Sequence, residues 1–104
     1  QFREIMVVKK NGRKSSFDRD KLSKSIYIAL KKRPIDTDTA EKFISKIYRS
    51  LEELGQIEIS SNTIGTMVME GLKELDPVAY VRFASVYRSF SDVEDFNNAI
   101  KDLD

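Results

Sequence analysis

The sequence of 104 residues contains neither cysteine nor histidine. Without cysteine there is no disulfide framework and no thiolate metal site. Without histidine the usual zinc ligand sets and the Ser-His or Cys-His catalytic pairs are excluded. The sequence has no apolar run of transmembrane length and no signal-peptide pattern, so nothing points to a membrane or to export, and we expect a cytoplasmic location. The chain is poorly equipped for catalysis, and we expect that it is not an enzyme.

The composition is that of one soluble globular domain, with 40% hydrophobic and 34% charged residues. The net charge of +1 hides an asymmetry along the chain. Residues 1–33 carry eleven Lys or Arg against three Asp or Glu, whereas residues 34–104 carry seven against fourteen. This polarity indicates that anion-binding chemistry lies in the first third. It would also let basic and acidic faces pair between copies of the chain.

The pair Asn-Gly at 11–12 lies between two short β-compatible runs and predicts a β-hairpin with a type I′ turn. A two-residue turn places Lys10 opposite Arg13 and Lys9 opposite Lys14. Like charges directly opposite each other destabilise a hairpin, so the free chain would carry a repulsion that a polyanion at the tip relieves. A solvated hairpin with a charged tip is the alternative interpretation.

The remaining hydrophobic pattern predicts an α+β fold, with a small three-stranded sheet and four to five helices. The strands are expected at 5–8, in a second run that ends at Phe17, and at 57–59, where a short strand would join the hairpin. The expected helices run from about 19 to 32, from a cap at Asp38 to Leu54 before Gly55, and from Ser60 or Ser61 to Leu75. A fourth helix is expected from 78 to 90, after the cap Asp76 and Pro77, and a fifth from a cap at Ser91 with Glu94 to Leu103. The helix at 78–90 is apolar on most of its circumference, so we expect it to be central.

Two glycines lie inside the predicted helix that ends at Leu75. Each costs about 1 kcal/mol of helix stability relative to alanine, so a glycine there usually marks a close approach of another group. Gly71 is expected to be a packing contact. Gly65 lies one turn after the helix start, where free backbone amides also attract phosphate.

Several features could hold an anion: the hairpin tip, Lys21 at a helix start, the helix start at Ser61–Gly65, and Arg82. If they converge, they suit a nucleoside triphosphate, with ammonium groups and amides for phosphate and with Val7 and Phe17 against base or sugar. Arg82 lies on a mostly apolar helix and must be paired, with a carboxylate by default or with ligand phosphate.

Two segments carry a family resemblance. The first, V-V-K-K-N-G-R-K-x-x-F-D-R-D-K-L at 7–22, resembles the opening of the ATP-cone, the nucleotide-sensing domain at the front of many ribonucleotide reductases. The second, L-D-P-V-A-Y-V-R-F-A-S-V-Y-R-S-F at 75–90, is similar to the ATP-cone of the bacterial repressors of ribonucleotide reductase genes. The resemblance implies a three-stranded sheet with a bundle of helices, binding of ATP and dATP, and a nucleotide-dependent oligomeric state that controls DNA binding.

The resemblance also implies which residues contact the nucleotide. Carried over position by position, these contacts are Val7, Lys9, Lys10, Phe17, Asp18, Lys21, Leu22, Ser61, Thr63 and Gly65. Arg82 and Tyr87 are the predicted contacts from the helix at 78–90, for the phosphate and adenine ends respectively. Asp18 and Asp20 would either support a magnesium ion that accompanies the nucleotide or cap a helix, and capping is the preferred interpretation.

One departure from the repressor pattern concerns zinc. Those repressors carry a four-cysteine zinc ribbon ahead of the ATP-cone, and this ribbon reads the DNA. The present chain has no cysteine and begins at Gln1, a few residues before the first strand, so we interpret it as an excised domain. Zinc and operator recognition are then expected only in the missing ribbon. Residues 1–91 would form the ATP-cone, and residues 92–104 a C-terminal helix that packs back or makes contacts in a homo-oligomer.

Two other functions are compatible with the sequence. The chain resembles the allosteric activity domain at the N-terminus of a ribonucleotide reductase as well as the repressor domain. A nucleotide-free helical interaction module that uses the basic 1–33 segment to bind DNA is the alternative from another class, and it predicts salt-sensitive binding.

Overall fold

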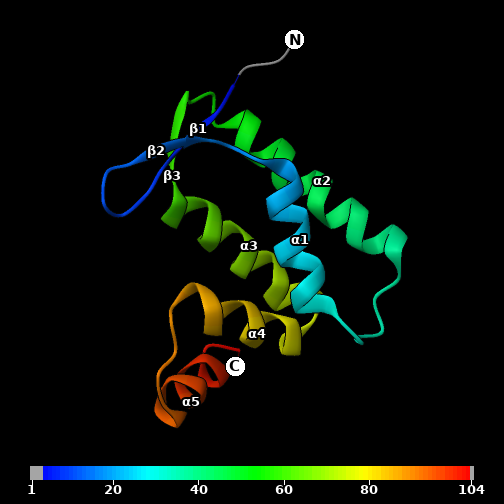
Figure 1. The fold of residues 1–104 in the computed structure, drawn as a ribbon. Coiled ribbons are helices and arrows are strands. Elements are labelled where there is room, and N and C mark those ends of the chain that lie inside the picture. The colour runs from blue at the N-terminus through cyan, green and yellow to red at the C-terminus, as the bar shows by residue number, and fades with distance from the viewer. Residues whose placement is uncertain (1–3, 104) are drawn as a thin grey trace.

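The computed structural model describes residues 4–103 and contains a three-stranded sheet with five helices (Figure 1), which confirms the predicted α+β fold. In chain order the elements are β1 (Met6–Val8), β2 (Lys14–Ser16), α1 (Arg19–Leu30), α2 (Thr37–Glu53), β3 (Glu58–Ser60), α3 (Ser61–Leu75), α4 (Pro77–Tyr87) and α5 (Val93–Lys101). The helix α4 packs against α1, α3 and α5, while α2 packs against α1 and α3. The sheet lies at one end of the molecule and α5 at the other.

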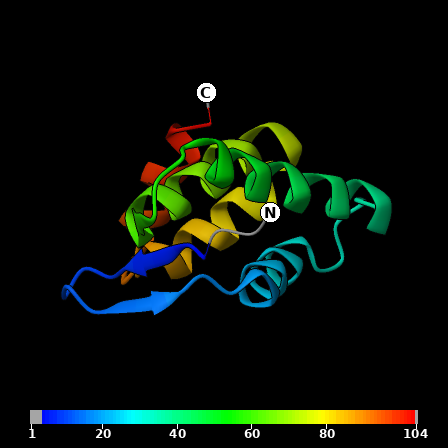
Figure 2. The same cartoon turned by 90° about the horizontal axis from the view of Figure 1, so that it is seen from above.

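The sheet is mixed, with strand order β2-β1-β3. The central strand β1 pairs antiparallel with β2 and parallel with β3, with Val7 opposite Ser15 on one side and Ile59 on the other. The prediction that a short third strand joins the hairpin is therefore confirmed. Seen from above, the turn of the hairpin projects beyond the helices at one edge of the molecule (Figure 2).

The predicted hairpin exists, but its predicted two-residue turn is wrong. The Lys9 amide donates to the Arg13 carbonyl (2.8 Å), so these two residues face each other and the loop consists of residues 10–12. Gly12 has φ +86°, whereas Asn11 is not among the non-glycine residues with positive φ. The Asn11 side chain instead accepts a hydrogen bond from the Arg13 amide (3.0 Å), which favours a type I turn followed by a left-handed glycine.

This register changes which charges meet at the hairpin tip. Lys9 faces Arg13 as a like-charged pair, and Lys10 lies in the loop rather than opposite a cation. Lys14 lies opposite Val8, and its ammonium group forms an ion pair with Glu58 of β3 (2.7 Å). One repulsive pair therefore remains instead of the two that were expected.

The helix α1 begins and ends for identifiable local reasons. The Asp18 carboxylate accepts hydrogen bonds from the amides of Asp20 (3.0 Å) and Lys21 (3.3 Å), so Asp18 is the N-cap. The helix ends at Leu30, two residues before the predicted end, because Lys32 takes a left-handed conformation with φ +62°. Pro34 then prevents continuation.

Two predicted caps are displaced. Asp36, not Asp38, caps α2, since its carboxylate accepts from the amide three residues further on (2.8 Å). Asp92, not Ser91 with Glu94, caps α5 in the same way (3.1 Å). In both cases another acidic residue follows the true cap in the first turn of the helix, where negative charge also suits the helix dipole. The sequence therefore left the position of the cap uncertain by one or two residues.

The helix α4 begins as predicted, with Asp76 as N-cap and Pro77 at its first position, but it ends three residues early at Tyr87. Ser89 has φ +54°, which stops the helix. Tyr80 is buried, but Val86 is 80% exposed. The prediction that this helix is central is therefore correct for one face only, since Val86 is left mostly exposed at the edge of a hollow between α1 and α4.

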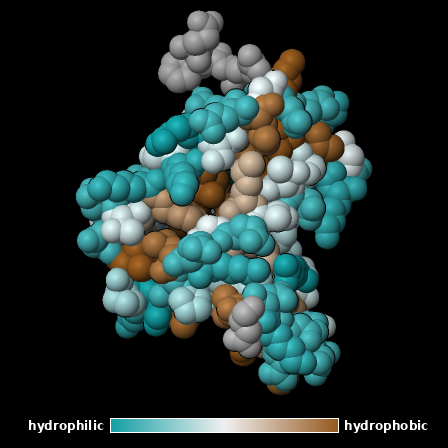
Figure 3. Space-filling view, turned by 180° about the vertical axis from the view of Figure 1, so that it is seen from behind, coloured by the Kyte–Doolittle hydropathy of each residue, from teal (hydrophilic) through white to brown (hydrophobic). Residues whose placement is uncertain are grey.

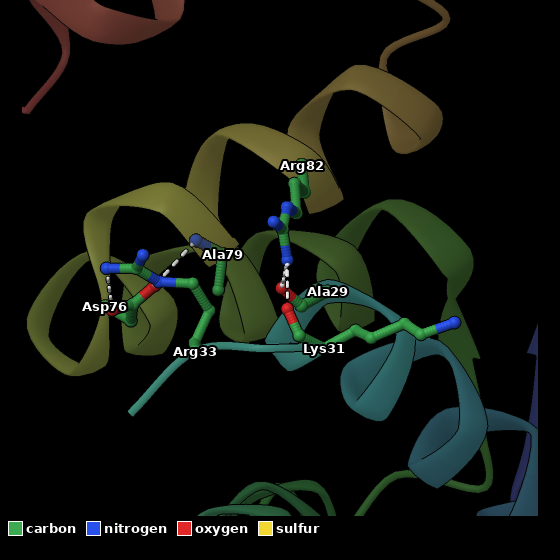
Figure 4. A network of polar contacts seen from close by, with 6 residues as sticks. All are labelled: Ala29, Lys31, Arg33, Asp76, Ala79 and Arg82. Carbon is green, nitrogen blue, oxygen red and sulfur yellow. Dashed lines mark hydrogen bonds and ion pairs between the residues drawn. The ribbon is translucent and has the colours of Figure 1, made fainter. Parts of the chain in front are cut away.

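A network of polar contacts joins the end of α1 to the start of α4 (Figure 4). The guanidinium of Arg33 makes two contacts with the buried Asp76 carboxylate, Nε to Oδ2 at 2.8 Å and Nη2 to Oδ1 at 3.0 Å. Asp76 Oδ2 also accepts from the Ala79 amide (2.9 Å). This network fixes the direction in which α4 leaves α3.

We expect Asp76→Asn to lower the free energy of unfolding by about 2–3 kcal/mol at neutral pH, because Arg33 loses its anionic partner. The hydrogen bond with Arg33 holds the pKa of Asp76 below its ordinary value of 3.8. The stabilisation is therefore fully present above the pKa of the unfolded state, and it is lost as the pH falls through the lower pKa of the folded state. Urea unfolding of both proteins over a pH series measures this difference.

The matched control is Asp38→Asn, because Asp38 is exposed and its contact with Lys42 is 3.7 Å long. That change should alter the stability by less than about 0.5 kcal/mol. A difference between wild type and Asp76→Asn that persists unchanged in acid would contradict the assignment.

Candidate functional site

A cavity of about 260 Å³ lies where the hairpin, the start of α1, the start of α3 and the end of α4 meet. Nine of the twelve residues predicted from the sequence line it: Val7, Lys9, Phe17, Asp18, Lys21, Leu22, Ser61, Gly65 and Tyr87. These residues come from segments up to eighty positions apart in the chain, so the fold brings together what the sequence analysis grouped.

The hairpin and α1 supply the cationic side. Val7 lies on β1 and Lys9 follows directly after its end, so the two side chains, two residues apart in extended chain, point to the same side. Phe17 follows β2, and its ring stacks on Tyr48 of α2 with centroids 5.7 Å apart. The Asp18 carboxylate caps α1, and Lys21 in the first turn of this helix also lines the cavity.

The helix start of α3 forms the opposite wall. Ser60 caps the helix by accepting from the Thr63 amide (3.0 Å), and its hydroxyl also contacts the Thr63 hydroxyl (2.8 Å). Gly65 is buried, and a Cβ atom built on it would lie 2.1 Å from Cζ of Tyr87. Gly65 thus permits the ring of Tyr87 to lie directly on the backbone of α3.

Tyr87 forms the end wall of the cavity. Its ring stacks on that of Phe83, with centroids 6.0 Å apart and planes 20° apart. Its hydroxyl donates toward the Ser61 carbonyl (3.3 Å) and Oδ1 of Asn62 (3.1 Å). Burial raises the pKa of Tyr87, so the hydroxyl is protonated at neutral pH and acts as a donor.

The family model described as the ATP cone domain matches residues 5–93. The chain is 83% identical over its full length to the transcriptional repressor NrdR of Pelagibacter ubique, of which it covers 68%. It is 57% identical over 103 residues to the NrdR of Xanthobacter autotrophicus and 53% identical to that of Rhodospirillum rubrum, of which it covers 57% and 68%. The chain belongs to the NrdR repressor family, in its ATP-cone domain. The resemblance seen in the sequence is thereby confirmed.

Three predicted contacts lie outside the cavity of this ATP-cone. Thr63 is turned toward its cap and lines a groove between α2 and α3. Lys10 lies in the hairpin loop, beside a separate polar hollow of about 250 Å³ that it shares with Arg88 and Tyr87. The position of Lys10 follows from the three-residue loop, which carries its side chain past the edge of the cavity.

Arg82 is paired with backbone carbonyls rather than with the carboxylate that was expected by default. Its Nη1 donates to the carbonyl oxygens of Ala29 (3.1 Å) and Lys31 (2.6 Å), so it caps the C-terminal end of α1 (Figure 4). A guanidinium is favourable there because it complements the unpaired carbonyls and the negative end of the helix dipole. A backbone carbonyl on another helix has no signature in the sequence, and for this reason the pairing of Arg82 with α1 was not predicted.

Five residues that line the cavity were missed by the sequence analysis: Ser15, Ser16, Ser25, Ile64 and Phe83. Two of them follow from helical spacing, since Ser25 lies four residues after Lys21 and Phe83 four residues before Tyr87. Whether Ser15 and Ser16 reach the cavity depends on the register of the hairpin, which was predicted incorrectly.

Within residues 4–103 no group of three or more carboxylates is arranged to hold a metal ion. None of the helices in that range is long and apolar enough to cross a membrane. The side chains that line the cavity are mainly lysines, hydroxyl groups and apolar groups, together with Asp18.

We expect Gly65→Ala to lower the free energy of unfolding by about 1–2 kcal/mol, because the new methyl group displaces the Tyr87 ring. In a Tyr87→Ala background the same change should instead raise it by up to about 1 kcal/mol, the gain in helix propensity. Urea unfolding of the four proteins in this double-mutant cycle measures the coupling. Equal effects of Gly65→Ala in both backgrounds would show that the ring does not lie on this glycine.

Proposed function

We propose that this chain is the nucleotide-sensing domain of a transcriptional repressor of ribonucleotide reductase genes. ATP or dATP would bind in the cavity, and occupancy would change how copies of the chain associate. DNA binding would follow from that assembly through a zinc ribbon outside this chain. The observation that carries the proposal is the convergence, within an ATP-cone, of Lys9, Lys21 and the start of α3 on one cavity with apolar walls.

The chemistry of the walls suits the two ends of a nucleotide. The ammonium groups of Lys9 and Lys21 provide charged hydrogen bonds for phosphate oxygens. Val7 and Leu22 provide apolar contact for base or sugar, and the Tyr87 ring offers a face on which a base can stack. The charged phosphates and the apolar base or sugar of a nucleotide would thus contact different walls of the same cavity.

The cavity is smaller than most ligand sites, which measure roughly 300–1,000 Å³. A nucleoside triphosphate would therefore extend beyond it. The polar hollow lined by Lys10 and Arg88 adjoins the cavity across Tyr87 and offers further cationic groups in that direction. Lys10 would then contact the nucleotide from outside the cavity proper.

The like-charged pair at the hairpin tip gives binding a physical consequence. Lys9 and Arg13 face each other across the end of the ladder, where their repulsion weakens the hairpin of the free chain. A bound polyanion would neutralise this repulsion and tighten the hairpin against α1 and α3. Any magnesium would enter with the nucleotide phosphates, because Asp18 is engaged as a helix cap.

The names of the relatives favour a repressor over a reductase as the parent of this domain, and a regulatory over a catalytic role. We place the protein in the cytoplasm, where a bacterial repressor meets its DNA. The alternative function, DNA binding through the basic 1–33 segment, makes a different prediction. It requires that this chain binds DNA in a salt-sensitive way and does not respond to nucleotide.

We expect titration calorimetry to show binding of ATP and of dATP to the chain. Lys9→Ala and Lys21→Ala should each weaken binding by about 1.5–3 kcal/mol, the contribution of a charged hydrogen bond. The matched control is Lys24→Ala, since Lys24 is exposed on the same helix but does not line the cavity.

Lys24→Ala should leave the affinity unchanged within about 0.5 kcal/mol. The absence of binding heat for the folded wild-type chain with either nucleotide would refute the proposed function. Equal losses in all three lysine variants would indicate general electrostatic attraction rather than contacts in the cavity.

A further inference from the structure

The helix α5 presents an exposed apolar stripe. Val93, Phe96 and Ile100 are 73%, 43% and 53% exposed, and their spacing places them along one side of the helix. An adjacent side carries the buried Ala99, and Phe96 also contacts Phe90 edge to face with centroids 4.9 Å apart. The helix is therefore anchored to its own domain through one side, while the stripe faces away from the described part of the chain.

A groove of about 740 Å³ lies between α2 and α3. Its floor is apolar and includes Phe43, Ile47 and Met67, and Gly71 lets the Phe43 ring approach the backbone of α3. Figure 3, a view from behind, shows a hollow with hydrophobic atoms at its base and a hydrophilic rim. The groove is thus concave and apolar where α5 is convex and apolar.

The charges at the two surfaces are complementary. The rim of the groove carries Lys46 on α2 and Glu70 and Glu74 on α3. Glu70 contacts Lys73 (3.7 Å), whereas Lys46 and Glu74 have no ion-pair partner within residues 4–103. The first turn of α5 holds Glu94 and Asp95, of which Asp95 accepts from the Ser91 amide (2.9 Å), and its last turn holds Lys101. A helix laid along the groove with Lys101 near Glu74 would bring Glu94 toward Lys46.

The lengths also agree. Nine helical residues span about 13.5 Å, and the stretch of α3 from Asn62 to Leu75 that lines the groove spans about 20 Å. The α5 of the same chain cannot reach this groove, because it packs against α4 at the end of the molecule away from the sheet (Figure 1). A second copy of the chain is the occupant that carries both the stripe and the matching charges.

We propose that α5 of one copy docks in the groove between α2 and α3 of another copy. The two contacting surfaces are different, so the contact is heterologous, and each copy offers both halves of it. Copies can then add in a closed ring or an open chain. Because one short helix buries a small area, the association should depend strongly on concentration.

The groove and the candidate nucleotide cavity share a wall. Ser61 and Gly65 of α3 line the cavity, while Asn62, Thr63 and Thr66 on the same turns of α3 line the groove. Coupling between the two sites, which rests on the proposed function, would then consist of a shift of this part of α3 on nucleotide binding. The docking itself depends only on the groove and the stripe.

The test uses two variants that each destroy one half of the contact. Ile100→Glu puts a carboxylate on the stripe near Glu74, and Ser50→Arg fills the groove from α2. Sedimentation analysis of the wild-type chain, with and without ATP, should show a mass that rises with concentration. Each variant alone should remain monomeric. An equimolar mixture should form heterodimers that grow no further, because Ile100→Glu keeps an intact groove and Ser50→Arg keeps an intact stripe.

Matched controls separate this contact from others. Val86→Glu changes an apolar residue of α4 that is even more exposed, and it should assemble like wild type. Glu74→Lys combined with Lys101→Glu should restore the assembly that either reversal alone weakens. Circular dichroism verifies folding, with Val93→Glu replacing Ile100→Glu if that variant unfolds.

A wild-type chain that stays monomeric under all these conditions would overturn the proposal. So would a mixture of the two variants that stays monomeric, because a heterologous contact requires complementation. Calorimetry on the same variants distinguishes this failure from that of the proposed function, since Ser50 and Ile100 lie outside the cavity and their replacement should leave ATP binding intact.

Discussion

The contact between Arg33 and Asp76 determines how the end of α1 and the start of α4 meet. Asp76 is buried between α3 and α4, caps α4 and accepts both arms of a guanidinium that follows α1. A buried carboxylate without a partner is strongly unfavourable, so α4 is held against the end of α1 in one orientation. That orientation carries Phe83 and Tyr87 to the cavity, seven and eleven residues further along. The site therefore depends on an ion pair that does not contact it.

The hairpin and α4 contribute to the cavity in opposite ways. The end of α4 is rigidly placed, because Arg82 holds the carbonyls of α1 and the Tyr87 ring lies on Gly65. The hairpin is a short, exposed ladder with a like-charged pair at its tip. A polyanion would thus act mainly on the hairpin, because the like-charged pair of Lys9 and Arg13 lies there. The end of α4 would thus keep its place when a ligand binds, whereas the hairpin would respond to the ligand.

In the proposed function, helix α3 is the element that would connect nucleotide binding with assembly. One side of it faces the cavity and another faces the groove between α2 and α3. Its two internal glycines each admit an aromatic ring, Tyr87 at Gly65 and Phe43 at Gly71, so both neighbours pack closely on its backbone. Both glycines lower the helix propensity of α3 and allow an aromatic ring to pack on its backbone.

The sequence by itself determined the elements and indicated much of the lining of the candidate cavity. Hydrophobic periodicity, the cap-and-proline pair at Asp76 and Pro77, and Gly55 after α2 locate the helices, because these signals act within one or two turns. Tertiary structure alone decided the hairpin register, the partner of Arg82 and the exposure of Val86. Each of these depends on a group far away in the chain or on a turn whose alternatives differ by little energy. Local patterns specify which segments form, whereas the pairing of distant polar groups is set only when the segments pack.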